Sequence, residues 1–379
     1  MDVECASKDM TNASPGPVVL WDSYGLQNPY SGIGYYGLQL YSALKQMGCT
    51  PQVIPSQAID ENATGIPTAL KAHPLSFVTR FKPIALTLAD LKFQEFFRKY
   101  GHIDRFVIHG LSNFNLPRDI GRRAHGKRVI TVHDLIPDIY PQGVSRTLRS
   151  FLRRQMPKTL ERADAIICVS QWTRDALEER YPSVSTRTVV IPNGFPEIKS
   201  HRISEAQEKP SILTVARYEA YKRLDLIPKI AQQLAHPVEW NIVTDDKGEK
   251  LILEGLSDDR LKRNLRFHKR ISHEQLEKLF ETSSLYLHPS LYEGFCLPAA
   301  QAIAHGLPVL YCRGSGIDEV VQSAGLGLGS HQSPADWAQS IEMISASRVE
   351  FQKRVEHRQR DASNWKDVAT RTHQLYDKI

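Results

Sequence analysis

Residues 285–321 read LYLHPSLYEGFCLPAAQAIAHGLPVLYCRGSGIDEVV, and this stretch decides the fold. An apolar, strand-like run covers 284–288, and a loop that carries Glu293 follows it. The pattern then predicts a helix over 298–305, a buried strand over 307–311, a glycine-rich turn and a short final helix. This alternation predicts a parallel sheet, and open α/β sheets bind ligands at the carboxyl ends of their strands.

The loop before the predicted helix is suited to an anion. The first turn of a helix exposes unpaired N–H groups and carries about half a positive charge, so the amides of Phe295, Cys296 and Leu297 are candidates to hold a phosphate. Glu293 would repel a phosphate, and its presence is better explained if it binds a neutral partner that is rich in hydroxyl groups. A sugar attached to a diphosphate meets both demands.

The segment EGFCLPAAQAIAHGLPVL, followed by GSGIDEVV, resembles the nucleotide-sugar site of retaining GT-B glycosyltransferases of family 4. The signature of that family is two glutamates separated by seven residues. The first matches Glu293, but the second falls on Gln301, where an amide would bind the nucleotide ribose more weakly than a carboxylate. The resemblance implies an α/β protein with a GT-B fold, in which two Rossmann-like, doubly wound parallel-sheet domains face each other across a cleft.

The length of 379 residues also favours two domains. Residues 1–17 are polar and lack apolar periodicity, so we expect a flexible tail and no signal peptide. We expect an acceptor-binding domain over 18–200 and a nucleotide-sugar donor domain over 201–360, with a polar linker at 197–209. The last residues, 361–379, resemble the closing helix by which family members return to the first domain.

Composition narrows the function classes. No apolar run reaches the ~18 residues of a membrane-spanning helix, so we expect a soluble or membrane-peripheral protein. A net charge of +6 is too modest to favour a nucleic-acid partner. The five cysteines are odd in number and form no CxxC pair, which favours free thiols in a reducing, cytoplasmic compartment.

Positive charge is concentrated in three places, 118–128, 146–158 and 260–270, and the second of these lies in a predicted helix over 145–162. The helix could pack on the core with a solvated basic face, or it could rest on an anionic membrane at the inner face of the cell membrane. Both interpretations stay open. The basic residues are Arg146, Arg149, Arg153, Arg154 and Lys158.

A strand over 18–22 is followed by a glycine-rich turn and a helix from Ile33. Close helix packing explains Gly32 and Gly34 about as well as contact with a phosphate does. Their position after the first strand is similar to the glycine loop of GT-B enzymes, and this favours contact with the donor diphosphate. The region 51–81 reads as irregular, and we predict no regular element there.

Two predicted strands of the first half end in histidine. Arg105–His109 ends in His109, which could be a structural hydrogen-bonding residue or a site residue. The strand 127–132 ends in His133 and Asp134, within VITVHDLIP. That segment resembles the family's HD or HE segment beside the donor sugar, which implies a site role for His133 and Asp134.

The second half opens with SILTVARYEAYKRLDL. Arg217 lies just past a predicted strand over 211–215, and Lys222 lies five residues later. A guanidinium can bind two phosphate oxygens, and an ammonium acts as a point charge, so the pair suits a diphosphate, although a solvated surface pair is the simpler alternative. The match to the family's strand-R-x4-K element favours the phosphate role.

Rival enzyme classes lack their motifs. The chain has no Asp-x-Asp of a metal-dependent GT-A transferase and no GxxxxGK[ST], and its glycines are followed by no acidic partner for a dinucleotide. The resemblance to family 4 implies a retaining, metal-independent enzyme without cofactor that moves a hexose from a GDP- or UDP-sugar to a saccharide or lipid-linked acceptor, in bacterial cell-surface polysaccharide synthesis. Two alternatives are a sugar-nucleotide epimerase of the same fold and an inactive sugar-nucleotide-binding protein.

Overall fold

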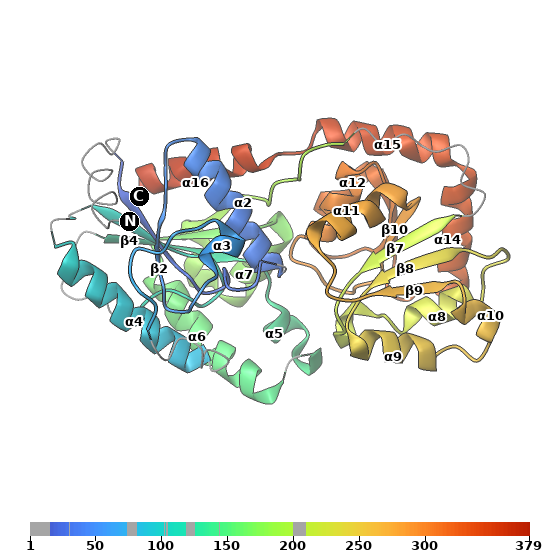
Figure 1. The fold of residues 1–379 in the computed structure, drawn as a ribbon, viewed down its shortest axis with the longest axis horizontal. Helices are drawn as coiled ribbons and strands as arrows, with labels where there is room; N and C mark the ends of the chain where they lie inside the picture. Colours follow the sequence, from blue (N-terminus) through green and yellow to red (C-terminus); the bar gives the residue numbers. More distant parts are fainter. Residues whose placement is uncertain are drawn as a thin grey trace.

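The computed structural model describes residues 16–29, 31–73, 82–101, 103, 105–118, 126–143, 145–199 and 210–379. Two α/β domains lie side by side, and each is built on a six-stranded sheet (Figure 1). The expected architecture of two doubly wound, parallel-sheet domains is confirmed. The expected tail at 1–17 lies almost wholly outside the described residues, and so does most of the expected linker at 197–209.

The first sheet has the strand order β2-β1-β3-β4-β5-β6, and all its pairs are parallel. The order reverses beside β1, so the carboxyl ends of β1 and β3 flank the switch point at which such sheets bind ligands. The strands are β1 (Val18–Asp22), β2 (Gln52–Ile54), β3 (Phe106–Gly110), β4 (Gly126–Val132), β5 (Ala165–Cys168) and β6 (Thr188–Val190).

The second sheet has the order β12-β11-β10-β7-β8-β9, which is the Rossmann order with its switch point between β7 and β10. The loops that follow β7 and β10 therefore leave the same sheet edge as neighbours. They carry Lys222 and Glu293, respectively. The strands are β7 (Ser211–Val215), β8 (Glu239–Val243), β9 (Leu265–His268), β10 (Leu285–His288), β11 (Val309–Cys312) and β12 (Gly325–Leu328).

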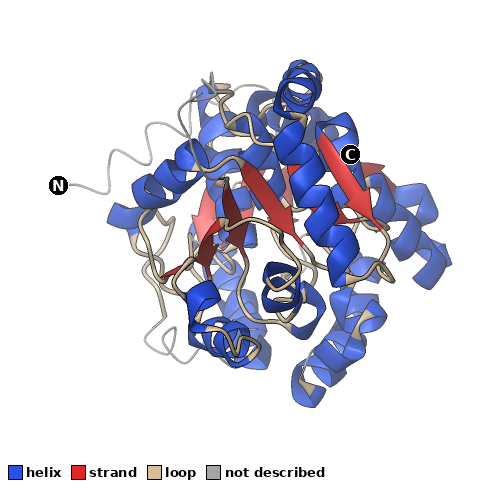
Figure 2. Cartoon of the chain, turned by 90° about the vertical axis from the view of Figure 1, so that its right-hand side faces the viewer, coloured by secondary structure: helices blue, strands red, loops and turns tan. Residues whose placement is uncertain are grey.

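Helices cover both faces of each sheet, and the strands lie inside (Figure 2). Each sheet separates two apolar clusters, which is why most of its strands are buried on both faces. The first-domain helices are α2 (Gly32–Gln46), α3 (Glu61–Thr64), α4 (Lys82–Lys99), α5 (Ile136–Ile139), α6 (Arg146–Arg162) and α7 (Gln171–Arg180). Those that follow are α8 (Leu226–Ala231), α9 (Asp246–Glu254), α10 (Asp259–Lys262), α11 (His273–Thr282), α12 (Leu297–Ala304), α13 (Ile317–Val321), α14 (Pro334–Ala346), α15 (Arg348–Arg360) and α16 (Trp365–Lys378).

The last helix, α16, leaves the second domain and packs in the core of the first (Figure 1). Trp365, Val368 and Tyr376 are buried there with residues of β1 and α2. The crossing itself is tight, because a Cβ on Gly194 would lie 2.6 Å from the amide nitrogen of Trp365. The two chain segments that join the domains therefore run against each other.

The basic helix α6 packs on the first sheet through Met156 and Leu160, and its Arg153, Arg154 and Lys158 are exposed. Core packing is therefore present, and membrane contact through the basic face stays a prediction. Within the described part of the chain, no helix is both long enough and apolar enough to span a membrane.

Candidate functional site

Glu293 lies at the switch point of the second sheet, in contact with one side chain from the loop after β7 and one from the end of β10. The Lys222 ammonium pairs with Glu293 Oε1, and His288 Nε2 lies 2.6 Å from the same oxygen. Glu293 and Lys222 are 12% and 18% exposed at their side chains, and His288 is buried. The structure therefore brings together two of the expected donor-site residues and adds a third.

The electrostatics of this cluster keep both partners charged. Burial would raise the pKa of Glu293, but Lys222 and His288 outweigh burial and lower it to about 2. Burial would lower the pKa of Lys222, but the attraction of Glu293 outweighs it and raises that pKa above its usual value. The cluster is thus a carboxylate and an ammonium that satisfy each other when no ligand is bound.

His288 is a site residue that the sequence reasoning missed. It is the last residue of β10, and its Nδ1 lies 3.0 Å from the hydroxyl of Tyr286, whose ring stacks on it. The available signal was its place at the end of a predicted strand, a place that it shares with His109 and His133. A contact with Glu293 orients the carboxylate toward the strand end.

The amides expected to hold a phosphate lie where α12 begins. Cys296 is the N-cap of the helix with φ 78°, and no side chain caps the first turn. Among the described residues, the amides of Phe295, Cys296 and Leu297 donate to no partner. Three free N–H groups at the positive end of a helix form a suitable anion site.

The two glycines of the first domain differ in their surroundings. A Cβ on Gly34 would lie 2.0 Å from the carbonyl oxygen of Asn28, and its amide already donates to Ser31 Oγ at 3.0 Å. Close packing therefore accounts for Gly34. A Cβ on Gly32 would lie 4.0 Å from Leu297 Cδ1, so the start of α2 faces the start of α12 across the domain boundary. The diphosphate role of both glycines stays a prediction.

His133 lies opposite Glu293, at the end of β4. A Cβ on Gly294 would lie 1.7 Å from the carbonyl oxygen of His133, so only glycine fits beside this backbone. His133 Nε2 donates to the Leu111 carbonyl at 2.9 Å, which leaves Nδ1 without the proton in the neutral ring. Burial lowers the pKa of His133 to about 4, so the imidazole is neutral at pH 7.

Asp134 and Arg217 are less closely tied to the cluster. Asp134 Oδ1 accepts a hydrogen bond from the amide of Ile136 at 3.1 Å, which starts α5. Arg217 is exposed on the loop after β7 and forms no ion pair or hydrogen bond with the described residues. The structure therefore joins Lys222 and Glu293, while Arg217 lies at the same sheet edge without contact to either.

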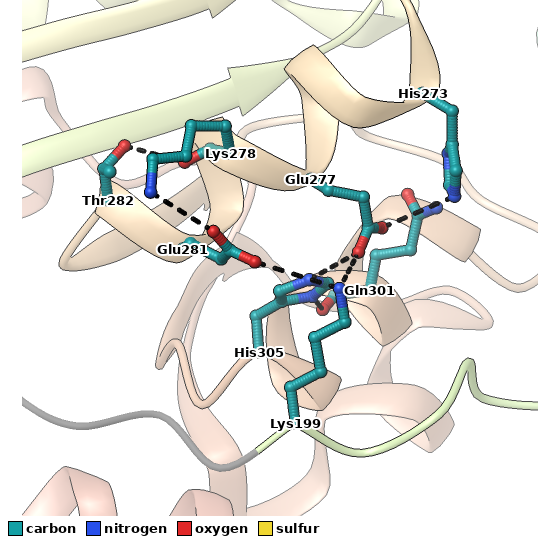
Figure 3. A network of polar contacts seen from close by, with 8 residues as sticks. All are labelled: Lys199, His273, Glu277, Lys278, Glu281, Thr282, Gln301 and His305. Carbon is teal, nitrogen blue, oxygen red and sulfur yellow. Dashed lines mark hydrogen bonds and ion pairs between the residues drawn. The ribbon is translucent and has the colours of Figure 1, made fainter.

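Gln301, which takes the place of the second family glutamate, is buried on α12. Its side chain points toward the carboxylate of Glu277 on α11 (Figure 3). Glu277 is held by His305 Nε2 at 3.0 Å and by the Lys199 ammonium. Burial would raise the pKa of Glu277, but Lys199 and His305 outweigh burial and lower it. An acidic group therefore lies near position 301, although it comes from another helix.

His109 is part of the fold rather than of this cluster. It is fully buried, with Nδ1 2.6 Å from the Tyr376 hydroxyl on α16 and Nε2 2.7 Å from Thr131 Oγ1. Burial lowers its pKa to about 3. Of the two interpretations of His109, the structural one therefore agrees with its contacts.

The spacing of His288, Glu293 and Cys296 would suit a metal ion, because their ligating atoms lie within 4.8 Å of one another. Two features disfavour a cation there. The Lys222 ammonium already shares the oxygen of Glu293, and burial holds the pKa of the Cys296 thiol well above its usual value. A thiol that keeps its proton is a poor metal ligand.

Two family descriptions match consecutive parts of the chain. The family described as Glycosyltransferase Family 4 matches residues 30–197, and the family described as Glycosyl transferases group 1 matches residues 197–362. The gpi3 subunit of phosphatidylinositol N-acetylglucosaminyltransferase from Schizosaccharomyces pombe is 25% identical over 231 residues, 58% of this chain and 50% of that protein. The O-antigen chain mannosyltransferase RfbU from Salmonella typhimurium is 24% identical over 184 residues, 48% of this chain and 51% of that protein.

The chain thus spans about half the length of these curated relatives. Two of the solved structures that share its fold align with almost the whole chain. Sucrose-phosphate synthase from Thermosynechococcus elongatus has a TM-score of 0.76 at 22% identity, covering 96% of this chain and 98% of that one. Anabaena HepE in complex with UDP-glucose has a TM-score of 0.72 at 16% identity, covering 95% and 99%. With two consecutive family matches that run from residue 30 to residue 362, the chain belongs to the group 1 glycosyltransferases of family 4.

Proposed function

We propose that the protein is a retaining, metal-independent hexosyltransferase that uses a GDP- or UDP-sugar and acts in the cytoplasm, in bacterial cell-surface polysaccharide synthesis. The observation that carries the proposal is the Lys222–Glu293 pair beside the three free amides of residues 295–297, with His133 opposite. Mannosyl and N-acetylglucosaminyl transfer by the relatives supports a sugar donor, and UDP-glucose bound to HepE supports a nucleotide diphosphate.

In this mechanism the donor separates the Lys222–Glu293 ion pair and becomes the new partner of both residues. The diphosphate takes Lys222, the amides at the start of α12 and the exposed guanidinium of Arg217, so charge on the leaving group is stabilised without a metal. Glu293, released from Lys222, accepts hydrogen bonds from the sugar hydroxyls, and its low pKa keeps it ionised. Gln301 contacts the ribose.

We propose no side-chain nucleophile for this mechanism. The acceptor hydroxyl attacks the anomeric carbon from the face of the departing diphosphate, whose oxygen takes the proton, so the configuration is retained. His133 and Asp134 border the sugar from the first domain. Because its ring is neutral and Nε2 is bound to Leu111, His133 can offer Nδ1 only as a hydrogen-bond acceptor.

A cavity of about 480 Å³ in the first domain supports a place for the acceptor. It begins directly after the His133–Asp134 segment and lies between α5, α6 and α7. Arg153 and Arg180 line it together with two carboxylates and several apolar residues, and this mixed lining suits the hydroxyl groups of a saccharide. Its other walls are formed by Leu135, Pro137, Asp138, Ile139, Pro141, Ala176 and Glu179.

A donor screen tests the proposal. The purified protein is incubated with UDP-, GDP- and dTDP-sugars, with and without saccharide and lipid-linked acceptors, in the presence of EDTA. We expect transfer to an acceptor with retained anomeric configuration, which NMR of the product reads directly. Turnover without an acceptor would establish an epimerase instead, and binding without turnover would establish an inactive sugar-nucleotide-binding protein.

A further inference from the structure

The two domains touch through a carboxylate that caps a helix of the other domain. Glu319 of α13 accepts hydrogen bonds from the backbone amides of Gln171 and Trp172, at 2.8 and 2.7 Å. These amides open α7 of the first domain, and the next one is capped by Ser170 of the same domain at 3.0 Å. Both oxygens of Glu319 are thus used across the domain boundary.

Glu319 is joined to Glu293 by a short chain of backbone contacts. The amide of Glu293 donates to Ser315 Oγ at 3.2 Å, and its carbonyl accepts from the Gly316 amide at 2.9 Å. Gly316 directly precedes α13, which carries Glu319. The backbone on both sides of Glu293 is therefore fixed by the turn that leads into this helix.

The same surface of α7 also contacts the Glu293 loop directly. Thr173 Oγ1 donates to the Gly294 carbonyl at 3.3 Å, and the ring of Trp172 packs edge-on against Tyr292, with centroids 4.7 Å apart. The Tyr292 hydroxyl in turn accepts from the amide of Leu135 at 2.9 Å, next to Asp134. These contacts place the Glu293 loop against both α7 and the end of β4.

From these contacts we propose that Glu319 is a positioning residue, which holds the loop of Glu293 against the first domain in the arrangement that binds the donor. Its carboxylate is well matched to the task, because ionised acceptors at a helix N-terminus make strong, charge-assisted hydrogen bonds. The helix that carries it is braced from behind, since Arg358 of α15 donates to the Val320 carbonyl at 2.8 Å. Movement of α7 is thereby transmitted to Glu293 and not absorbed by α13.

The two hydrogen bonds of Glu319 to α7 favour a closed arrangement, in which the two domains are in contact. Without them, open arrangements of the domains become more populated. The apparent affinity for a donor that needs both domains is then reduced in proportion to the fraction of molecules that remain closed. A saturating donor restores closure. The defect should therefore appear as a higher KM for the donor, with a smaller change in kcat, and this kinetic part of the inference rests on the proposed function.

The test compares Glu319→Ala and Glu319→Gln with a matched control, Glu342→Ala. Glu342 also accepts a backbone hydrogen bond, from the Ala235 amide at 2.9 Å, but within the second domain. Nitroxide labels on unnatural amino acids at Leu91 and Met343, which are exposed on α4 and α14, report the distance between the domains by pulsed EPR. Steady-state kinetics with the donor found in the screen give KM and kcat.

We expect Glu319→Ala to widen the distance distribution and to raise KM about tenfold, Glu319→Gln to be intermediate, and Glu342→Ala to match the wild type. Unchanged distances and an unchanged KM in Glu319→Ala would overturn the inference. So would a fall in kcat at unchanged KM and distance. If Glu319→Ala does not fold, Glu319→Gln decides by the same criteria. A wild-type protein that transfers no sugar would overturn the proposed function, and the EPR distances would still decide whether Glu319 holds the domains together.

Discussion

The hydroxyl of Tyr376, on the last helix, lies 2.6 Å from Nδ1 of His109, on the third strand of the first sheet. Both residues are buried, so neither group can be satisfied by bulk water if its partner is removed. We predict that Tyr376→Phe lowers the free energy of unfolding by about 1–3 kcal/mol, the usual cost of an unsatisfied buried polar group. Urea denaturation followed by circular dichroism measures the change.

Tyr100→Phe is the control for this variant, because Tyr100 contributes ring contacts to Phe96 and Lys99 and is partly exposed. It should leave stability within about 0.5 kcal/mol of the wild type. If Tyr376→Phe is equally silent, the return of α16 to the first domain depends on apolar packing and not on this hydrogen bond.

Stability should depend on pH through His109. The unfolded residue takes a proton near pH 6.5, whereas burial keeps the folded residue neutral down to about pH 3. Between these values the unfolded chain binds more protons, so the free energy of unfolding falls as the pH falls below 6.5. We predict a loss of roughly 2 kcal/mol from His109 between pH 6.5 and pH 5.

His109→Gln should flatten this part of the pH profile, while His236→Gln, at an exposed position, should leave it unchanged. Urea denaturation at pH 7, 6 and 5 provides the comparison. A slope that is identical in wild type and His109→Gln would mean that other groups dominate the acid sensitivity. His133, whose pKa burial lowers to about 4, is the next group to test.

Removing the Glu293 carboxylate should separate catalysis from donor binding. We predict that Glu293→Ala lowers kcat by orders of magnitude, because the sugar hydroxyls lose their acceptor, and near-normal turnover would refute this role. In Glu293→Gln, Lys222 loses its ionised partner and is free for the diphosphate, so the KM for the donor should stay equal or fall. Kinetics with the donor found in the screen measure kcat and KM. Lys222→Ala, which removes the ammonium, should chiefly raise the KM for the donor.

The convergence of Lys222 and Glu293 was predictable because it follows from topology. Each residue follows an apolar run, and the structure makes these runs neighbouring strands at a switch point.

Elements without a strong sequence pattern were missed. β12 consists of Gly325, Leu326, Gly327 and Leu328, and its glycines have no strand propensity. A Cβ on Gly325 would lie 2.0 Å from the Val309 carbonyl oxygen, so the close approach of the two strands requires glycine here. This tertiary contact has no signal in the local sequence.

A site residue could be predicted only where its type and its neighbours in the sequence left few possible roles for it. Glu293 was identified from its place before a helix, but the sequence could not show that His288 would contact it, because four residues, one of them a proline, lie between them. Gly34 illustrates the reverse case. Its spacing from Gly32 is compatible with a phosphate loop, yet its surroundings are backbone atoms of the preceding turn. Side-chain surroundings of this kind arise from tertiary packing and have no local signal.

An uncharged glutamine at position 301 suits its surroundings better than a glutamate would, because the carboxylate of Glu277 lies nearby. The Gln301 side chain points toward Glu277, whose charge is balanced by Lys199 and His305 (Figure 3). A second buried carboxylate would add like-charge repulsion and a desolvation cost. We therefore predict that Gln301→Glu alone lowers the melting temperature, whereas Gln233→Glu, at an exposed position on the same domain, does not.

The double variant Gln301→Glu with Glu277→Gln should recover the lost stability, because it leaves a single carboxylate at these two positions, as in the wild type. It should also bind a nucleoside diphosphate several-fold more tightly than the wild type, since a carboxylate at position 301 accepts stronger hydrogen bonds from the ribose than an amide does. Differential scanning calorimetry and isothermal titration with UDP and GDP measure these two effects. A single variant that melts at the wild-type temperature would show that Glu277 does not influence position 301. Unchanged nucleotide affinity in the double variant would show that the ribose is bound elsewhere.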